Sequence, residues 1–440
     1  MHMKNRKSLV FRFLTVISVT LLLFGSGVTL KADETLSDDY RLEEVVVLSR
    51  HNIRAPLSTK GSALDTATPY TWYEWSSNAS ELSLRGGMLE TAMGQYFRKW
   101  LEDEELIPEN YRPQGNEIRF YANAKQRTIA TAQYFSSGFL PVANIRIETN
   151  QEYDKMDPVF TPQLTFVNDR YVEDATKQMY ELIPDLSKEY ELISEVVDLK
   201  NSEGYLNGTI HDFSNDDIEF IMEENAEPGM KGSLKTACSL SDALVLQYYE
   251  ESDALAAGFG HDLSSEQWKM ISNIKDTYND VLFTAPLVCI NVAHPLLKEI
   301  DKELKNDERL FSFLCGHDSN ISSVLASLDV EDYAVPDSIE RNTPIGSKLT
   351  FEKWEKDNEE YIRVRLIYDS TDRLRNISIH DLKNPPMSYV FAFKGLTANE
   401  DGMYRLDEFM EHLQKKINAY DELIRKYDAK SSSIPKTGIE

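Results

Sequence analysis

The chain has 440 residues, of which 41% are hydrophobic, so it can bury a sizeable core and is not a disordered protein. Its 47 basic and 73 acidic residues give a net charge of −26, which argues against general binding to nucleic acid or to an anionic membrane. An anionic ligand would therefore need a local cluster of cations that overcomes the field of the whole molecule.

Residues 1–32 have the pattern of a secretory signal peptide. A basic start precedes an apolar stretch at residues 13–24, and Ala32 is a small residue suited to a cleavage site. The alternative is an uncleaved membrane anchor, but the sequence Gly-Ser-Gly at residues 25–27 interrupts the apolar stretch. We therefore expect an exported protein that has no membrane contact after the signal is removed.

Three segments have the pattern of strands in a parallel α/β sheet, in which a solid apolar run leads through a polar loop into a helix. The first run is residues 43–49. The second is residues 117–122, followed by a helical pattern over 125–135, and the third is residues 310–315, followed by one over 321–328. The fold class we expect is α/β, with a mostly parallel central sheet flanked by helices.

The stretch from residue 154 to 275 differs from the sequence around it. Apolar residues recur there at helical spacing, acidic residues dominate, and strand-like runs are scarce. This pattern predicts an α-helical cap inserted into an α/β domain that consists of residues 36–153 and 276–427. Strand-like patterns return at residues 361–368 and 387–393.

Chemically versatile side chains follow each of the three predicted strands. Because the carboxyl ends of parallel strands meet at one edge of a sheet, these side chains should converge there. Arginine carries a fork of donors that matches phosphate oxygens, and the start of a helix also favours an anion. The sequence therefore predicts a phosphate pocket, whose residues are Arg50, His51, Arg54, Arg127, His317 and Asp318.

Such a pocket supplies most of what phosphoryl transfer needs, because fixed arginines stabilise the charge on the transferred group. A histidine nitrogen can take the phosphoryl group covalently, and a carboxyl group can protonate the departing alcohol and then activate water. We assign the first role to His51 and the second to Asp318. The phosphate contacts fall to Arg50, Arg54, Arg127 and His317. This scheme needs no metal or other cofactor, and its partner is a small phosphorylated substrate.

The dipeptide His-Asp is weak evidence by itself, because it occurs four times. Only His317 follows a compact apolar strand through a single glycine; the pairs at His211, His261 and His380 are interpreted as solvated. For the loop at residues 50–56, the alternative is two arginines paired with surface carboxylates and an ordinary loop histidine. The strand context disfavours that alternative.

The loop sequence RHNIRAP resembles the RHGxRxP signature of the histidine acid phosphatases, and GHDSN at residues 316–320 resembles their C-terminal His-Asp motif. The resemblance covers residues 42–413. It implies an α/β domain with a helical cap and a phosphohistidine mechanism without a metal. Within the family, TPYTWYEW, LRGGMLETAMGQY and RNTPIGSKLTFEKW are most similar to the bacterial periplasmic glucose-1-phosphatase branch.

Carried over position by position, the resemblance implies a nucleophile at His51, a proton donor at Asp318 and phosphate ligands at the four residues already named for that role. Asn52 also fits the branch, since phytases have glycine there. Glu227 corresponds to a cap residue that narrows the substrate site, although an ordinary surface glutamate at a turn remains an open alternative.

The substrate class implied is a sugar phosphate such as glucose 1-phosphate, hydrolysed by a secreted acid phosphomonoesterase. The first alternative is a phytase, but the predicted cap at residues 219–230 (EFIMEENAEPGM) is acidic, whereas a highly anionic substrate calls for a basic cap. The second is a catalytically inactive binding protein of the cell surface, which would have lost His51 or Asp318. Both residues are present.

Three further features complete the sequence. Cys238, Cys289 and Cys315 are too few and too far apart for a disulfide framework, so we expect free thiols. The aromatic residues at 72–75 are expected to pack a loop onto the body of the protein rather than to form a wall for a sugar ring. The polar tail at residues 428–440 contains Ile434-Pro435-Lys436-Thr437-Gly438, which resembles a sortase signal for cell-wall attachment but lacks the apolar and basic segments that follow such signals.

Overall fold

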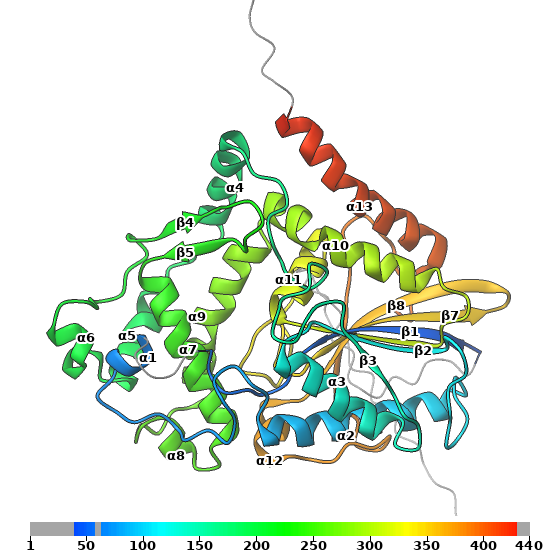
Figure 1. The fold of residues 1–440 in the computed structure, drawn as a ribbon, viewed down its shortest axis with the longest axis horizontal. Coiled ribbons are helices and arrows are strands. Elements are labelled where there is room, and N and C mark those ends of the chain that lie inside the picture. The colour runs from blue at the N-terminus through cyan, green and yellow to red at the C-terminus, as the bar shows by residue number, and fades with distance from the viewer. Residues whose placement is uncertain (1–38, 58–62, 429–440) are drawn as a thin grey trace, which may run out of the picture.

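The computed structural model describes residues 39–57 and 63–428 (Figure 1). Both the predicted signal peptide and the tail after Asp428 lie outside these residues. Figure 1 shows a twisted sheet with helices on both faces, beside a second group of helices that carries a small β-hairpin. In the part of the chain that is described, no single helix is long and apolar enough to cross a membrane; only α9 (Ser265–Phe283) and α10 (Pro286–Leu304) together, bent by 83°, meet that test.

The central sheet has eight strands, in the order β10-β8-β7-β1-β6-β2-β3, with β9 paired to β8. One half of the sheet is parallel, and its members are β1 (Arg41–Arg50), β6 (Phe311–Gly316), β2 (Ile118–Ala122) and β3 (Ile147–Glu148). The other half pairs antiparallel and comprises β7 (Lys348–Lys356), β8 (Glu359–Tyr368), β9 (Met387–Val390) and β10 (Tyr404–Arg405). The three strands predicted from apolar runs, now β1, β2 and β6, are confirmed.

The prediction of a mostly parallel sheet is wrong, because the sheet is mixed. Strands β7 and β8 are joined by two residues, Asp357 and Asn358, whose φ angles are 55° and 63°. A two-residue turn with both φ angles positive closes a hairpin, and a hairpin makes its strands antiparallel. The Asp-Asn pair between two strand-like runs is the sequence signal for this turn.

Helices cover both faces of the sheet, which explains the solid apolar run of β1. Val45 and Val47 pack in a core beneath α2 (Leu84–Asp103) and α3 (Gln126–Phe139). Val46 and Leu48 pack in the opposite core, beneath α10 (Pro286–Leu304), α11 (Asp318–Ser327) and α13 (Leu406–Asp428). The edge where the predicted site residues were expected to converge is thus formed by strands that are buried on both sides.

The second group of helices lies between β3 and α10 in the chain and has its own core. Its members are α4 (Asp169–Glu181), α5 (Ser187–Val196), the short helix η1 (Leu199–Asn201), α6 (Glu203–Leu206), the hairpin of β4 (Glu219–Ile221) and β5 (Gly229–Lys231), α7 (Ser233–Glu250), α8 (Ala254–Ala257) and α9 (Ser265–Phe283). Two short helices from elsewhere, α1 (Ala63–Thr66) and α12 (Thr371–Asn376), contact α7. The predicted boundary at residue 275 falls inside α9, so this helix runs through both predicted parts.

Candidate active site

The loops after β1, β6 and β2 meet at one edge of the sheet. These strands are adjacent and parallel, with Arg50 paired to Gly316 and Ala122 paired to Cys315. A cavity of about 400 Å³ opens at this edge. Six of the seven residues predicted for the site line it: His51, Arg54, Arg127, Glu227, His317 and Asp318. The seventh, Arg50, is 2% exposed and lies behind the cavity wall, where its Nη2 is 3.2 Å from Oδ2 of Asp318.

His51 is held as a neutral imidazole with one ring nitrogen unprotonated. Its Nδ1 lies 2.9 Å from the backbone carbonyl oxygen of Asn52, which can only accept, so Nδ1 carries the proton and Nε2 keeps its lone pair. Burial, together with the charges of Arg127 and Arg54, lowers the pKa of His51 well below its ordinary value. An unprotonated nitrogen is therefore available at acidic pH.

Arg54 and Arg127 supply positive charge on the cavity wall. Arg54 forms an ion pair with Asp242 of α7, with 3.1 Å between Nη2 and Oδ2. Arg127 lies in the first turn of α3, where the helix N-terminus adds to the positive field. Burial and the charge of Arg54 lower the pKa of Arg127 to about 10, and its Nε has no hydrogen-bond partner among the described residues. A bound anion would satisfy this partly buried guanidinium.

Asp318 is the first residue of helix α11, and its carboxyl group is ionised. Burial alone would raise its pKa, but the charges of Arg50, and then of Lys275, outweigh burial and hold this pKa well below the ordinary range. A phosphate group bound in the cavity would bring negative charge beside the carboxylate. That charge would oppose the arginines and raise the affinity of Asp318 for a proton.

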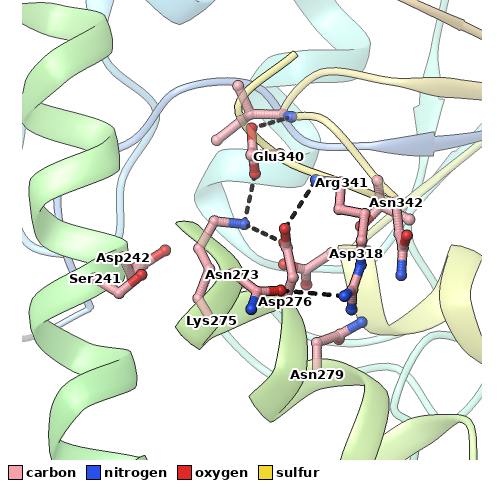
Figure 2. Close-up of polar contacts among 12 residues, drawn as sticks. Ser241, Asp242, Asn273, Lys275, Asp276, Asn279, Asp318, Glu340, Arg341 and Asn342 are labelled. Carbon is pink, nitrogen blue, oxygen red and sulfur yellow. Dashed lines mark hydrogen bonds and ion pairs between the residues drawn. The ribbon is translucent and has the colours of Figure 1, made fainter. Parts of the chain in front are cut away.

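Arg50 belongs to a buried set of charges whose other members, Lys275, Asp276 and Glu340, were not predicted from the sequence. Glu340 accepts hydrogen bonds from Nη1 of Arg50 at 2.6 Å and from Nζ of Lys275 at 2.7 Å, and Lys275 also lies 3.1 Å from Oδ1 of Asp276. Figure 2 shows Lys275 of α9 between these two carboxylates, with Asp276 in turn accepting from the backbone of Arg341. Glu340, Lys275, Asp276 and Asp242 were not singled out from the sequence; the tertiary fold brings them to the site beside Arg50.

Apart from the predicted phosphate-site residues, the lining of the cavity, called here the outer wall, is largely apolar or acidic. Its apolar and aromatic members include Met156, Pro228, Tyr278, Leu282 and Phe283. Glu227 lies there too. Desolvation of its carboxylate by the surrounding protein raises the pKa of this group, although the charge of Arg127 opposes the shift. The residue is exposed and lines the cavity; its part in substrate choice stays a prediction.

Other expectations for single residues have mixed outcomes. Cys289 and Cys315 are buried free thiols, whereas Cys238, also free, is partly exposed on the cavity wall. Trp72 packs against Phe259 and donates to a backbone carbonyl, which confirms the packing role of this aromatic loop. The interpretation of His380 as a solvated residue is wrong: it is fully buried, with Nε2 2.7 Å from Asp369.

The guanidinium groups of Arg54 and Arg127, an unprotonated histidine nitrogen and a carboxylate surround one cavity at the carboxyl ends of parallel strands. This arrangement defines a phosphatase-type enzyme. Comparison with known proteins agrees with this class. The chain belongs to the histidine phosphatase superfamily (branch 2), whose family model matches residues 41–369.

Individual relatives and structures refine the comparison. A glucose-1-phosphatase of Providencia rettgeri is 35% identical over 388 residues, covering 86% of this chain and 93% of the relative. The phytase AppA of Escherichia coli is 26% identical over 398 residues, covering 85% and 91%. The apo form of Hafnia alvei phytase has the same fold, with a TM-score of 0.80 at 23% identity, covering 88% of this chain and 99% of the phytase.

Proposed function

We propose that this protein is a metal-independent acid phosphomonoesterase that hydrolyses sugar phosphates through a phosphohistidine at His51. The observation that carries the proposal is the unprotonated Nε2 of His51 in a cavity whose wall includes Arg54, Arg127 and His317. A neutral imidazole beside fixed cations is a competent nucleophile toward a phosphate ester. Asp318 lines the same cavity and is the carboxyl group to which we assign protonation of the leaving group.

The reaction proceeds in two displacements. In the first, Nε2 of His51 forms a bond to phosphorus as the ester P–O bond breaks, and the departing alcohol oxygen takes a proton from Asp318. In the second, Asp318 accepts a proton from water, the water oxygen attacks phosphorus, and the P–N bond breaks to release phosphate and restore His51. Arg54 and Arg127 neutralise the charge on the phosphoryl oxygens throughout, His317 donates a hydrogen bond to one of these oxygens, and Arg50 adds its charge from behind the cavity wall.

The outer wall supports a sugar phosphate as the substrate. Beyond the arginines, the basic residues of the described lining are Lys235 and Lys275, and Lys275 is already paired with two carboxylates. Glu227 and Asp242 add negative charge on the same wall, which would repel the extra phosphates of inositol hexakisphosphate. The glucose-1-phosphatase of Providencia rettgeri, the more similar of the two relatives, supports the same choice. Phytate hydrolysis is the second candidate, favoured by the fold shared with Hafnia alvei phytase.

The N-terminal pattern supports export, so we place the mature enzyme outside the cytoplasm. Attachment to a cell wall through residues 434–438 is part of the same proposal only if the chain continues into an apolar, basic segment.

The test is phosphate release at about pH 5 in the presence of a chelator, with acid-stable and acid-labile phosphoenzyme measured after rapid quenching. Wild-type protein should release phosphate and form an acid-labile, base-stable phosphoenzyme, and His51→Ala should do neither. His211→Ala, which removes an exposed histidine, is the matched control and should behave as wild type. Turnover by His51→Ala would show that the covalent scheme is wrong.

The substrate is tested separately by comparing glucose 1-phosphate with phytate at equal concentration. A clear preference for the sugar phosphate supports the outer-wall argument, whereas a preference for phytate keeps the chemistry and overturns the substrate.

A further inference from the structure

His317 is fixed on both sides by neighbours that normally donate hydrogen bonds. Its Nε2 lies 2.7 Å from Nδ2 of Asn123, and its Nδ1 lies 3.4 Å from Nη2 of Arg127. Asn123 is fully buried and His317 is 6% exposed, so these contacts are made away from bulk water. Asn123 is the first residue after β2, where polar side chains were expected to gather, yet the sequence assigned it no role.

The orientation of the Asn123 amide is set by the backbone. Its Oδ1 accepts a hydrogen bond from the backbone N–H of Asp157 at 2.9 Å. A backbone N–H can only donate, so the oxygen must face Asp157 and the amide nitrogen must face His317. The backbone of Asn123 is also fixed, because its N–H donates to Cys315 and its carbonyl accepts from the Thr128 hydroxyl.

This orientation determines the tautomer of His317. An amide NH₂ group only donates, so Nε2 of His317 must present a lone pair and the ring proton must lie on Nδ1. The Nδ1–H group and the guanidinium of Arg127 then face each other as two donors. An anionic oxygen placed near both would accept from both, and the buried, unpartnered Nε of Arg127 shows that this partly buried guanidinium has capacity for such a ligand.

The two histidines of the cavity are therefore protonated on the same ring atom but present opposite groups. His51 donates through Nδ1 to the carbonyl of Asn52 and leaves the Nε2 lone pair for attack. His317 accepts at Nε2 from Asn123 and leaves Nδ1–H for a phosphate oxygen. Their rings are only 5.4 Å apart, so the direction of these two hydrogen bonds decides which one is the nucleophile.

We propose that Asn123 is a positioning residue that keeps the proton of His317 on Nδ1, so that His317 and Arg127 donate to one phosphate oxygen and His317 does not compete with His51 as a nucleophile. This inference rests on the proposed function, because it takes His317 as a phosphate ligand. It adds to that function a residue that touches neither the substrate nor the reacting atoms.

The first test is ¹⁵N NMR of the histidine side chains in the full-length protein, with the His317 signals assigned by their loss in His317→Gln. In the wild type, Nδ1 should be protonated and Nε2 unprotonated. Asn123→Asp keeps an oxygen acceptor for Asp157 but replaces the donor facing His317 by an acceptor, so Nε2 should gain a proton. A protonated Nε2 in the wild type would overturn the proposal.

The second test measures binding of inorganic phosphate, which does not depend on turnover. Asn123→Ala adds no charge and frees the ring to move its proton, so the Kd for phosphate should rise about 10-fold or more, as expected for a lost hydrogen bond to a charged oxygen. In a His317→Gln background the same change should alter Kd by less than about 2-fold. An equal loss in both backgrounds would mean that Asn123 acts on the fold rather than through His317, and would overturn the proposal.

The two tests also separate this inference from the function on which it rests. If wild-type protein binds phosphate and shows the expected tautomer but hydrolyses no ester, the proposed function fails while the role of Asn123 stands. If the enzyme turns over normally but Nε2 of His317 carries the proton, the proposed function stands and the role of Asn123 fails.

Discussion

Nζ of Lys275 lies 2.7 Å from Oε1 of Glu340, the same oxygen that accepts a hydrogen bond from Arg50 at 2.6 Å. The other carboxylate oxygen of Glu340 accepts from the Tyr249 hydroxyl and from a backbone N–H, so the group has no freedom to move. Although burial opposes it, the charges of Arg50 and Lys275 lower the pKa of Glu340 to about 2. One fixed carboxylate thus anchors the arginine that contacts Asp318.

Lys275→Met should destabilise the protein substantially. The change leaves Glu340 and Asp276 buried with one cation fewer, and breaking a buried ion pair from one side costs about 3–5 kcal/mol. Urea or thermal unfolding measures the loss. Lys269→Met is the matched control, because Lys269 lies on the same helix in an exposed pair with Glu266 and should cost no more than about 1 kcal/mol. Equal losses in the two variants would contradict a special role for Lys275.

Asp318→Asn should slow esters with poor leaving groups far more than p-nitrophenyl phosphate. An alkoxide must be protonated as it departs, whereas a nitrophenolate needs little help. The ratio of kcat/KM for glucose 1-phosphate to that for p-nitrophenyl phosphate should therefore fall by about 10²-fold, the lower end of what general acid catalysis contributes. A proportional loss on both esters would assign Asp318 to some role other than the acid.

Arg127→Gln should move the acidic limit of phosphoenzyme formation to higher pH. Besides burial, the Arg127 charge is the largest contribution that lowers the pKa of His51, so removing it raises that pKa toward the ordinary value of about 6.5. More of His51 is then protonated at a given acidic pH, and the protonated ring cannot attack. Rapid-quench measurements across pH, each normalised to the variant's own maximum, give the shift.

Lys235→Gln serves as the control for this experiment, since Lys235 lines the same cavity. It should leave the pH profile of phosphoenzyme formation unchanged. A profile for Arg127→Gln that matches the wild type would mean that burial alone sets the protonation of His51.

The strands that carry the site could be predicted because they are buried on both faces, which demands a solid apolar run. β7 could not be found in the same way. Its Lys348 and Glu352 are fully buried charged residues that pair with Glu90 on α2 and with arginines of β8. Since those partners lie far away in the sequence, the strand looks polar and half-exposed when it is considered alone.

The residues of the site were likewise predictable only where their position depends on local sequence. Arg54, His51 and their neighbours follow predicted strands, so their convergence could be inferred from parallel pairing. Asp242 and Lys275 lie on helices α7 and α9, and nothing in a helical pattern indicates which of its polar residues will face a cavity. Asn123 directly follows a predicted strand, so its place near the site could have been predicted. The direction in which its amide points could not, because it is set by a hydrogen bond from the backbone N–H of Asp157, which is distant in the sequence.

Glu227→Gln together with Asp242→Asn should shift selectivity toward phytate. The two carboxylates lie on the cavity wall, and their removal lowers the repulsion of a second and third phosphate on one substrate. We expect the ratio of kcat/KM for phytate to that for glucose 1-phosphate to rise about 10-fold, and the rise should shrink with added salt because the effect is electrostatic. An unchanged ratio would leave the shape of the outer wall, rather than its charge, as the source of any preference.

Gly94→Ala should destabilise the protein even though alanine is the better helix former. In the middle of α2, the change gains about 1 kcal/mol in helix propensity. A Cβ at Gly94, however, would lie only 2.1 Å from the carbonyl oxygen of Phe135, and a Cβ at Gly138 of α3 would meet Thr91 of α2 in the same way. The two helices therefore touch through their backbones, and neither side can yield without moving a helix.

Forced separation of packed elements costs about 1–3 kcal/mol or more, which outweighs the propensity gain. Since α3 carries Arg127 in its first turn, the variant should also lose kcat/KM. Gly229→Ala is the control: its nearest neighbour would be the Cβ of Ile221 at 3.7 Å, an ordinary contact, so stability should change by less than about 0.5 kcal/mol. If the melting temperature of Gly94→Ala equalled or exceeded that of the wild type, the α2–α3 interface would have room for a methyl group. The position of Arg127 would then not depend on the close contact between these two helices.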